Sequence, residues 1–506
     1  MDNANLYHQL YQHFSQDLNA PCIELSDGTC YSYGELDQWS AGMAAALTQL
    51  GAAPGDRVVV QVGKSPAAVA LYLACLRGGF VLVPLNTAYT ANELEYFIGD
   101  ATPAVVVCDP ERENEIAGLL PPASVLASLD GGAHDLAALG RTTKNSNGVL
   151  SRSKQDLAAI LYTSGTTGRS KGAMLSHGNL ASNAMTLHKL WGFREGDVLL
   201  HALPIFHVHG LFVALNVAMR NGSRILFLEK FATETVLAKL HRATVMMGVP
   251  TFYTRLLASP DFKPEHFAHM RLFISGSAPL TEQTFAQFES RTGMRILERY
   301  GMTETGMITS NPLEGERIAG TVGFALPGVD VRVCDEQGKP RTTGEVGVVE
   351  VRGPNVFPGY WQMPEKTAEE FRPGGWFITG DLGQLDSMGR LSIVGRAKDL
   401  IISGGFNVYA KEVELCLDAM SEITESAVIG VPHPDFGEAV VAICVATSHP
   451  PPDSKELLQA AASQLAAFKR PKAIMFTKAL PRNAMGKVQK NQLREMHKHL
   501  FSAASN

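Results

Sequence analysis

The run Tyr162-Thr163-Ser164-Gly165-Thr166-Thr167-Gly168-Arg169-Ser170-Lys171-Gly172 follows an apolar stretch, residues 157–161, that is typical of a buried strand. Glycine lets the backbone approach a ligand closely and turn its N–H groups inward, and Ser and Thr hydroxyls add further donors. The run therefore predicts a phosphate-binding loop. It is not a Walker A loop, in which Ser or Thr follows Gly-Lys directly, because here Gly172 follows Lys171.

The length and composition describe a large globular protein. A chain of 506 residues exceeds one ordinary domain, so we expect two or more. Hydrophobic residues make up 45% of the chain and charged residues 19%, which favours a soluble protein with large cores. A net charge of −6 argues against a general nucleic-acid or membrane-surface binder.

The N-terminal region and the cysteines indicate a cytoplasmic protein. The first basic residue is Arg57, so the N-terminus lacks the positive charges of a signal peptide or a mitochondrial presequence. The most apolar early segment, residues 67–76, is too short to span a bilayer. Seven cysteines are scattered without a C-x-x-C pair, which favours reduced buried thiols.

Short apolar runs alternate with amphipathic segments between residue 57 and about residue 350. This alternation predicts an α/β fold with parallel sheets flanked by helices. The expected strands are residues 58–62, 81–84, 105–108, 159–162, 198–203, 225–228, 245–249 and 272–275. The expected helices are residues 68–77, 180–190, 235–241 and 282–292. The polar stretch 130–154 is expected to be a loop or linker.

The pattern changes beyond residue 320. Short strands at 322–323, 329–334, 346–352 and 391–394, separated by glycine turns, predict a small antiparallel β unit. A smaller α+β unit follows, with helices at 411–420 and 455–468 and strands at 425–431 and 440–447. We place the domain boundary after residue 395, which gives a large domain of residues 1–395 and a small domain of residues 396–506.

Six compact motifs accompany the glycine-rich run in a fixed order. They are residues 204–210 (PIFHVHG), 275–280 (SGSAPL), 298–305 (ERYGMTET), 379–383 (TGDLG), 395–399 (GRAKD) and 481–488 (PRNAMGKV). Over nearly its whole length the chain resembles the adenylate-forming superfamily of acyl-CoA synthetases, luciferases and peptide-synthetase adenylation domains. The resemblance implies ATP, Mg²⁺ and coenzyme A as ligands, together with a small carboxylic acid.

The resemblance also implies roles for the residues of these motifs. Tyr300 would stack on adenine, Thr303 would bond the α-phosphate, Asp381 would accept the ribose hydroxyls, and Arg396 would contact ribose or phosphate. Glu304, with Thr163, would hold Mg²⁺, since a hard cation prefers oxygen ligands. The full nucleotide set is Thr163, Ser164, Gly165, Thr166, Thr167, Gly168, Lys171, Ser277, Glu298, Arg299, Tyr300, Gly301, Met302, Thr303, Asp381, Arg396 and Lys487.

Taken singly, these residues have simpler interpretations, which stay open. The loop could be a glycine turn with a solvated lysine, Tyr300 a core aromatic, and Glu304 a helix-cap carboxylate. Asp381 could form an Asx turn, and Arg396 a surface salt bridge.

The small domain is expected to be mobile. The resemblance makes Lys487, together with Thr303 and Glu304, catalytic, with the lysine stabilising the pentavalent phosphate transition state. Lys398 would be the hinge. After the hinge turns, Ser403, Gly404 and Gly405 would face the pantetheine of coenzyme A. Lys487 also resembles the acetylation site of relatives, which suggests a lysine acetyltransferase and a deacetylase as partners, since acetylation removes the charge.

Three runs indicate the acid. Residues 201–213, 248–257 and 297–305 are similar to those of the malonyl-CoA synthetases. This similarity implies that Arg255, with Ser277, holds a second carboxylate and that His207 walls the acyl pocket. Pattern alone places Arg255 equally well on the outer face of its helix. His207 and His209 also form a potential metal pair, without an obvious third ligand.

The expected reaction is therefore ATP-dependent ligation of malonate to coenzyme A, with methylmalonate as a second substrate because one methyl group changes discrimination by only about 1–3 kcal/mol. A short- or medium-chain fatty or aromatic acyl-CoA ligase is the alternative within the superfamily. A non-catalytic nucleotide-binding sensor is the alternative from another class. A luciferase-like oxidase would share the fold. A peptide-synthetase loading module is disfavoured, because the sequence contains no Leu-Gly-Gly-x-Ser element.

Overall fold

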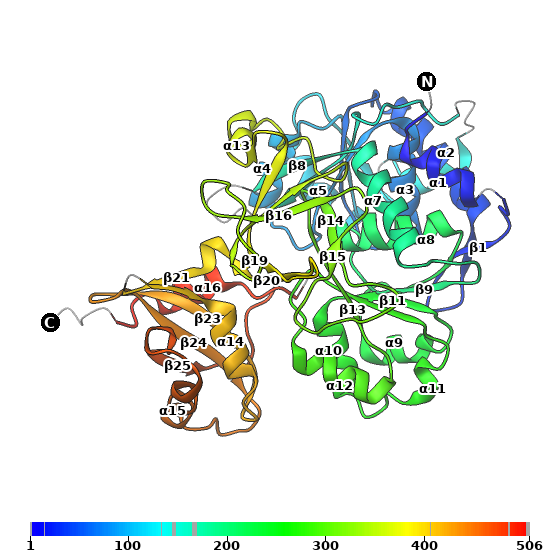
Figure 1. The fold of residues 1–506 in the computed structure, drawn as a ribbon. Coiled ribbons are helices and arrows are strands. Elements are labelled where there is room, and N and C mark those ends of the chain that lie inside the picture. Colours follow the sequence, from blue (N-terminus) through cyan, green and yellow to red (C-terminus); the bar gives the residue numbers. More distant parts are fainter. Residues whose placement is uncertain are drawn as a thin grey trace.

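The computed structural model describes residues 3–14, 16–132, 134–143, 148–163, 170–404, 406–483 and 486–501. In these ranges the strands form four sheets, three in a large domain and one in a small domain (Figure 1). The expected α/β class, with one large and one small domain, is confirmed. No helix in the described ranges combines the length and the apolar character that are needed to cross a membrane.

The first sheet has the strand order β6-β5-β3-β4-β7-β8. Its strands are β3 (Arg57–Gln61), β4 (Val81–Pro84), β5 (Val105–Cys108), β6 (Val125–Ser128), β7 (Leu157–Thr163) and β8 (Lys171–Ser176). All pairs are parallel except β7 and β8, which are antiparallel with Thr163 opposite Lys171. The strands that flank the expected phosphate loop thus pair as a hairpin, and β8 is a strand that the sequence did not indicate.

The second sheet has the strand order β15-β14-β13-β12-β11-β9-β10-β1-β2. Its strands are β1 (Pro21–Glu24), β2 (Cys30–Ser32), β9 (Val198–His201), β10 (Arg224–Phe227), β11 (Val245–Gly248), β12 (Leu272–Ser275), β13 (Leu297–Met302), β14 (Gly306–Ser310) and β15 (Phe324–Ala325). The central strands are parallel, and antiparallel strands close both edges. Motif residues follow β12 and lie on β13, so neighbouring strands deliver them to one edge.

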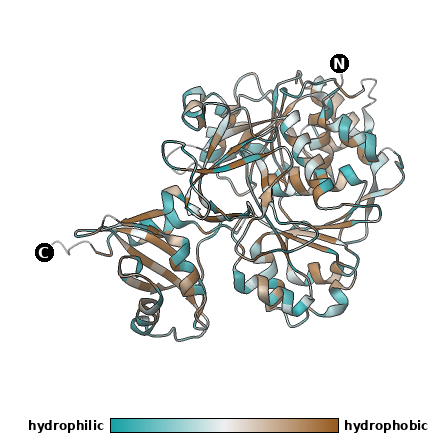
Figure 2. Cartoon of the chain, viewed as in Figure 1, coloured by the Kyte–Doolittle hydropathy of each residue, from teal (hydrophilic) through white to brown (hydrophobic). Residues whose placement is uncertain are grey.

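Helices cover these sheets, with hydrophobic strands inside and hydrophilic helix faces outside (Figure 2). They are α1 (Leu6–Phe14), α2 (Tyr33–Gln49), α3 (Pro66–Gly78), α4 (Ala91–Ala101), α5 (Glu113–Ala117), α6 (Leu136–Thr142), α7 (His177–Leu190), α8 (Asn216–Asn221), α9 (Thr233–Leu240), α10 (Pro250–Ala258), α11 (Pro264–Phe267), α12 (Glu282–Thr292) and α13 (Pro364–Glu369). Ser176 caps α7 and forms a capping box with Asn179.

The stretch 130–154 was expected to be a loop, and this prediction is wrong at α6. Asp135 caps α6 by accepting hydrogen bonds from the backbone N–H groups of Ala137 and Ala138. A Cβ atom on Gly42 of α2 would lie 1.8 Å from the carbonyl oxygen of Gly140. The two helices therefore pack at a distance that only glycine allows, a tertiary contact that local composition does not reveal.

The predicted antiparallel β unit is confirmed, but the strand expected at 322–323 is wrong, because Gly323 forms only an isolated bridge with Leu391 and the adjacent strand β15 belongs to the second sheet. Its strands are β16 (Asp330–Cys334), β17 (Gly347–Arg352), β18 (Phe371–Arg372), β19 (Trp376–Leu385) and β20 (Leu391–Arg396). All of their pairs are antiparallel. Asp381 of β19 lies opposite Arg396 of β20 in the register. The chain leaves this unit at β20 and enters the small domain (Figure 1).

The small domain has its own sheet and its own buried clusters. Its elements are β21 (Leu400–Ser403), β22 (Phe406–Tyr409), α14 (Ala410–Asp418), β23 (Ile423–His433), β24 (Gly437–Ala446), α15 (Ser454–Gln464), β25 (Ala473–Phe476) and α16 (Lys490–His497). The buried residues of its clusters run from Ile401 to Leu493, whereas the main cluster of the large domain runs from Leu6 to Leu391. Separate cores are what two bodies need in order to move as units.

Candidate active site

Three of the expected nucleotide-binding residues meet around one carboxylate. Tyr300 of β13 donates a hydrogen bond from its hydroxyl group to Oδ2 of Asp381 at 2.5 Å. The guanidinium of Arg396 pairs with Oδ1 of Asp381 at 2.6 Å. Asp381 is buried, so the salt bridge and the hydrogen bond offset the cost of burying its charge.

A second cluster lies around Glu304, between β13 and the β unit. Glu304 is buried, and its Oε1 accepts a hydrogen bond from the hydroxyl of Tyr360 at 3.1 Å. The same hydroxyl lies 2.6 Å from Oε2 of Glu370, and Oε1 of Glu370 accepts a hydrogen bond from Lys171 at 2.7 Å. Tyr360 and Glu370 were missed by the sequence analysis, because they lie outside the recognisable motifs.

The oxygen donors of this cluster suit Mg²⁺. Burial raises the pKa of Glu304, while Tyr360 and the charge of Lys171 lower it, so a cation placed at this carboxylate would stabilise its ionised form. Thr163 lies opposite Lys171 in the hairpin, and its hydroxyl lies 3.4 Å from the carbonyl oxygen of Lys171. The expected phosphate-loop residues Ser164, Gly165, Thr166, Thr167 and Gly168 lie outside the described residues.

Arg299, which the sequence analysis grouped with the nucleotide residues, lies against the Ser-Gly-Ser motif. A Cβ atom on Gly276 would lie 2.5 Å from Cζ of Arg299, so any larger residue there would displace the guanidinium. Arg299 is 2% exposed, and burial lowers its pKa to about 9. Among the described residues its Nε and Nη2 atoms have no hydrogen-bond partner. A buried guanidinium with unused donors is a ready site for an anion.

Ser277 and two histidines lie on the same side. Ser277 adopts a φ of 71°, which is unusual for a residue other than glycine. Its hydroxyl lies 3.2 Å from Nδ1 of His209, which is fully buried. His207 accepts a hydrogen bond at Nδ1 from the backbone N–H of His209 at 3.2 Å. Burial, followed by Arg299 and Lys487, lowers the pKa of His207 to about 4, so this side chain is neutral at pH 7.

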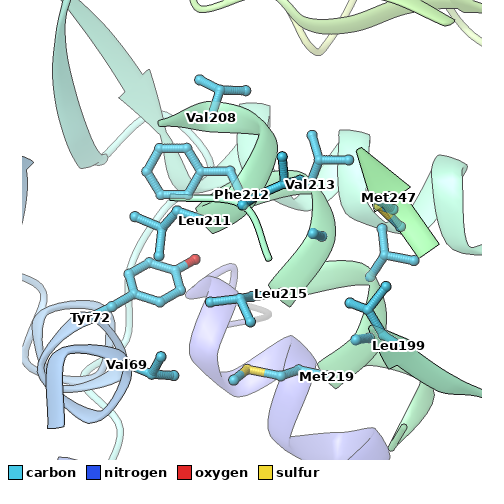
Figure 3. Packing of buried hydrophobic residues seen from close by; sticks show 14 of the residues in the cluster. Val69, Tyr72, Leu199, Val208, Leu211, Phe212, Val213, Leu215, Met219 and Met247 are labelled. Carbon is cyan, nitrogen blue, oxygen red and sulfur yellow. The ribbon is translucent and has the colours of Figure 1, made fainter. Parts of the chain in front are cut away.

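His209 begins a π-helix, η2 (His209–Leu215), which the sequence did not predict. The core around this segment fixes its position (Figure 3). Phe212 and Leu215 of η2 lie near Val69 and Tyr72 of α3, and all four side chains are buried. Such insertions in helices often occur at functional sites. Here the packed segment holds His209 beside Ser277.

Glu298 precedes Arg299 on β13, and successive strand residues point to opposite faces. Its Oε1 accepts a hydrogen bond from the backbone N–H of Leu280 at 3.1 Å. Among the described residues its buried Oε2 has no partner. Burial raises the pKa of Glu298 to about 7. The pair of adjacent charges thus does not form a simple salt bridge.

Arg255 takes the alternative position that the sequence left open. It lies on α10 and is exposed, whereas Tyr253 and Leu256 on the same helix are buried. Its helix begins near the loop of the small domain, because a Cβ atom on Gly486 would lie 3.0 Å from the hydroxyl of Thr251. Arg255 is therefore at the surface rather than in the buried part of the site.

Lys487 reaches the nucleotide site from the small domain. Its side chain stays accessible to solvent, but burial of the charge and Arg396 lower its pKa, whereas Asp381, Asp399 and Glu304 raise it. These neighbours include the carboxylates of both clusters described above. The structure therefore brings Lys487 together with the predicted nucleotide residues.

Of the expected hinge and coenzyme A residues, Lys398 lies next to this assembly, since burial and the charges of Arg396 and Lys487 lower its pKa to about 8. Lys398 lies in the turn η3 (Ala397–Asp399) and is exposed. Ser403 is buried at the end of β21 and pairs with Gly437 of β24. Gly404 has a φ of 58°, which favours glycine, and Gly405 lies outside the described residues.

The fold and this site define an enzyme that binds AMP. Residues 11–361 match the family described as AMP-binding enzyme, and residues 412–487 match the AMP-binding enzyme C-terminal domain. The chain belongs to the AMP-binding enzyme family.

Particular relatives narrow the comparison. The crystal structure of ATP-bound MatB from Rhodopseudomonas palustris is 52% identical, with a TM-score of 0.97, and covers 99% of this chain and 100% of that chain. Apo MatB from the same organism gives a TM-score of 0.84 at the same identity and coverage. The domain arrangement described here therefore resembles the ATP-bound form more closely.

Curated relatives are more distant. Malonate–CoA ligase of Arabidopsis thaliana is 32% identical over 520 residues, which cover 93% of this chain and 85% of the relative. Feruloyl-CoA synthase of an Amycolatopsis species is 34% identical over 471 residues, which cover 92% of this chain and 94% of the relative. These relatives are about equally similar to the chain, although one is named for an aromatic acid and the other for an aliphatic diacid. Sequence identity therefore does not identify the acid substrate, and the residues of the acyl site must be considered.

Proposed function

We propose that the protein ligates malonate to coenzyme A through a malonyl-adenylate, with cleavage of ATP to AMP and pyrophosphate. The observation that carries the proposal is the buried guanidinium of Arg299, whose Nε and Nη2 have no partner among the described residues. Similarity to malonate–CoA ligase of Arabidopsis thaliana and to MatB supports it.

The chemistry of Arg299 favours a substrate with two carboxylates. A planar guanidinium binds a carboxylate through two parallel hydrogen bonds, and burial strengthens them. A monocarboxylic acid would leave the cation desolvated and unpaired, which costs several kcal/mol. The site should therefore reject simple fatty and aromatic acids. It should accept methylmalonate, since the additional methyl group leaves both carboxylates in place.

The assignment of the acid-binding residues changes accordingly. The resemblance of the sequence to the malonyl-CoA synthetases implies that Arg255 and Ser277 hold the second carboxylate. Because Arg255 is exposed, we assign this role to Arg299 and Ser277 instead. His207, half-buried and neutral at pH 7, would form the wall of the acyl pocket without competing for the anion.

The first half-reaction joins two anions. An oxygen of the near carboxylate of malonate attacks the α-phosphorus of ATP, the new O–P bond forms, and the bond to pyrophosphate breaks. Lys487 and Thr303 would stabilise the charge that develops on the phosphate oxygens. Asp381 would orient the ribose, and Lys171 would bind the departing pyrophosphate. Mg²⁺, held by Glu304 and Thr163, would neutralise phosphate charge.

The second half-reaction needs a different arrangement. We propose that the small domain, residues 396–506, turns about Lys398 and replaces Lys487 by the segment of Ser403, Gly404 and Gly405. The thiolate of coenzyme A then attacks the malonyl carbonyl carbon, the thioester bond forms, and AMP leaves. The exposed hinge turn and the separate core of the small domain support this motion.

Pyrophosphate release with a panel of acids, with and without coenzyme A, tests the function. Malonate should give the highest rate, methylmalonate a lower one, and butyrate, benzoate and ferulate little release. Malonyl-CoA should form only when coenzyme A is present. Preference for butyrate, benzoate or ferulate would favour the alternative acyl-CoA ligase. No release with any acid would favour a non-catalytic nucleotide sensor.

Two further properties belong to this proposal. We place the protein in the cytoplasm, because its scattered cysteines are free and five of the seven are buried. We also expect acetylation of Lys487 by a lysine acetyltransferase to stop adenylation, since Lys487 is accessible to solvent. Mass spectrometry paired with activity, before and after deacetylation, checks the second expectation.

A further inference from the structure

Lys171, the lysine that would bind pyrophosphate, already has an anionic partner in the protein. Its Nζ donates to Oε1 of Glu370 at 2.7 Å, and the two side chains are only 17% and 21% exposed. The same ammonium lies 4.1 Å from the centre of the Tyr360 ring. Lys171 is therefore held by two residues of the segment that leads into β18 and β19, the carboxylate of Glu370 and the ring of Tyr360.

Glu370 is held by more than Lys171. Oε2 of Glu370 accepts a hydrogen bond from the hydroxyl of Tyr360 at 2.6 Å. Lys366, one turn earlier, lies 3.4 Å from Oε1 of Glu370. If Lys171 turned toward a phosphate, Tyr360 and Lys366 would still hold the carboxylate in place. Glu370 is thus a fixed negative charge next to the expected phosphate site.

The backbone reinforces this placement. Strand β8 pairs with the segment around Tyr360, because the N–H of Trp361 donates to the carbonyl oxygen of Gly172 at 2.7 Å and the N–H of Met174 donates to that of Gly359 at 3.1 Å. Lys171 and Tyr360 therefore keep their separation. A fixed anion near a polyanion site lowers the affinity for the polyanion.

We propose that Glu370 weakens the binding of pyrophosphate and of the β- and γ-phosphates of ATP by pairing with Lys171, so that the leaving group is released after adenylation. Glu370 acts through Lys171 and is a positioning residue. This inference rests on the proposed use of ATP but not on the identity of the acid.

Calorimetric titration of the full-length protein with inorganic pyrophosphate and with ATP, in the presence of Mg²⁺ and without any acid, tests the proposal. Glu370→Gln keeps the shape and the contact with Tyr360 but removes the charge. It should tighten pyrophosphate binding about three- to fivefold, the size expected for a partly exposed pair. Product inhibition by pyrophosphate should strengthen by a similar factor, and KM for ATP should fall.

The matched control is Glu369→Gln. Glu369 pairs with Lys366 at the surface and is 65% exposed, so its variant should leave pyrophosphate affinity unchanged. Glu370→Asp, which keeps the charge but shortens the side chain, should give an intermediate affinity and serves if Glu370→Gln does not fold. Unchanged or weaker pyrophosphate binding in folded Glu370→Gln would overturn the proposal. Tighter binding combined with rejection of malonate would overturn only the proposed acid.

Discussion

The two halves of the site treat charge differently. In the nucleotide half two ion pairs are already formed within the protein: Asp381 pairs with Arg396, and Lys171 pairs with Glu370. In the acyl half Arg299 is buried, and its Nε and Nη2 have no partner among the described residues. The nucleotide half therefore exchanges one set of ionic contacts for another when ATP binds, whereas the acyl half gains an ionic contact that it lacked.

This difference separates reaction from selection. Internal partners in the nucleotide half limit the net gain from binding, because each new contact replaces an existing one. An unpaired buried cation makes the free energy of acid binding depend strongly on one carboxylate. The nucleotide half should thus determine the chemistry and the release of products, and the acyl half should determine which acid reacts.

The largest expected effect is at Arg299. Arg299→Met should lower kcat/KM for malonate about a thousandfold, because the second carboxylate would be buried without a partner. Use of butyrate should rise, since the methionine offers an apolar surface. Pyrophosphate release with both acids measures the change. The thermal unfolding temperature should not fall, since the variant removes an unpaired buried charge.

Arg255→Met is the matched control for Arg299→Met. Since Arg255 is exposed, its variant should change kcat/KM for malonate less than threefold, as expected for a residue at the rim. If Arg255→Met lowered kcat/KM for malonate strongly and Arg299→Met did so only slightly, Arg255 would be the acid-binding residue. The difference in charge pairing between the two halves of the site would then not explain the choice of acid.

Lys487 tests the nucleotide half next. Lys487→Ala should slow formation of malonyl-adenylate about a hundred- to a thousandfold, because it removes a charge aimed at the transition state. Transfer of the acyl group from supplied malonyl-adenylate to coenzyme A should stay nearly unchanged, since in the proposed domain rotation Lys487 has left the site before that step. Rapid-quench assays of the two half-reactions measure both rates, and equal losses would argue against the assignment.

A smaller effect is expected at Asp381. Asp381→Asn should raise KM for ATP about tenfold, because the ribose loses a charged acceptor while Arg396 loses its partner. The wild-type preference for ATP over 2′-deoxy-ATP should narrow as well. Asp330→Asn is the control, since Asp330 forms an exposed pair with Arg352 in the same β unit. If the two variants behaved alike, Asp381 would have no special role in ribose binding.

The smallest expected effect concerns Glu298 and pH. Burial raises its pKa to about 7, so the folded protein binds this proton more tightly than the unfolded chain. The stabilisation is complete below the ordinary carboxyl pKa and is lost as pH rises through about 7. Glu298→Gln should remove that loss and unfold about 3 °C higher than the wild type at pH 8.5. Calorimetry between pH 5 and pH 8.5 measures the unfolding temperatures of both proteins. If the unfolding temperature depended on pH in the same way in the wild type and in Glu298→Gln, Glu298 would not be the group whose pKa is raised.

Elements with a regular local pattern could be predicted from the sequence. Glu282–Thr292 forms α12 with the expected bounds, and Val81–Pro84 forms β4 in the same way. Both have clear apolar periodicity and clear ends. Helix α6 and strand β8 were not indicated, because α6 depends on the close contact of Gly42 with Gly140 and β8 depends on pairing with β7. Tertiary partners, not local composition, determine these elements.

The site shows the same division. Tyr300, Asp381, Arg396 and Lys487 could be found from motifs, and the structure brings them together. The arginine that we propose to bind the acid could not be chosen from the sequence, because a pattern places a charge on a helix or a strand but does not give its burial. The sequence offered one indication that Arg299 is unusual: Glu298 and Arg299 are adjacent charged residues within strand β13, which begins with buried residues. Glu370 carried no signal, since a carboxylate near a polar helix end is common.

A crystal structure with a non-hydrolysable malonyl-adenylate analogue would show which residues bind the acid. The second carboxylate should lie about 3 Å from the guanidinium of Arg299 and from the hydroxyl of Ser277. Arg255 should remain in solvent. A carboxylate bound by Arg255, or exposed to water while Arg299 keeps its unpaired donors, would show that Arg299 does not select the acid.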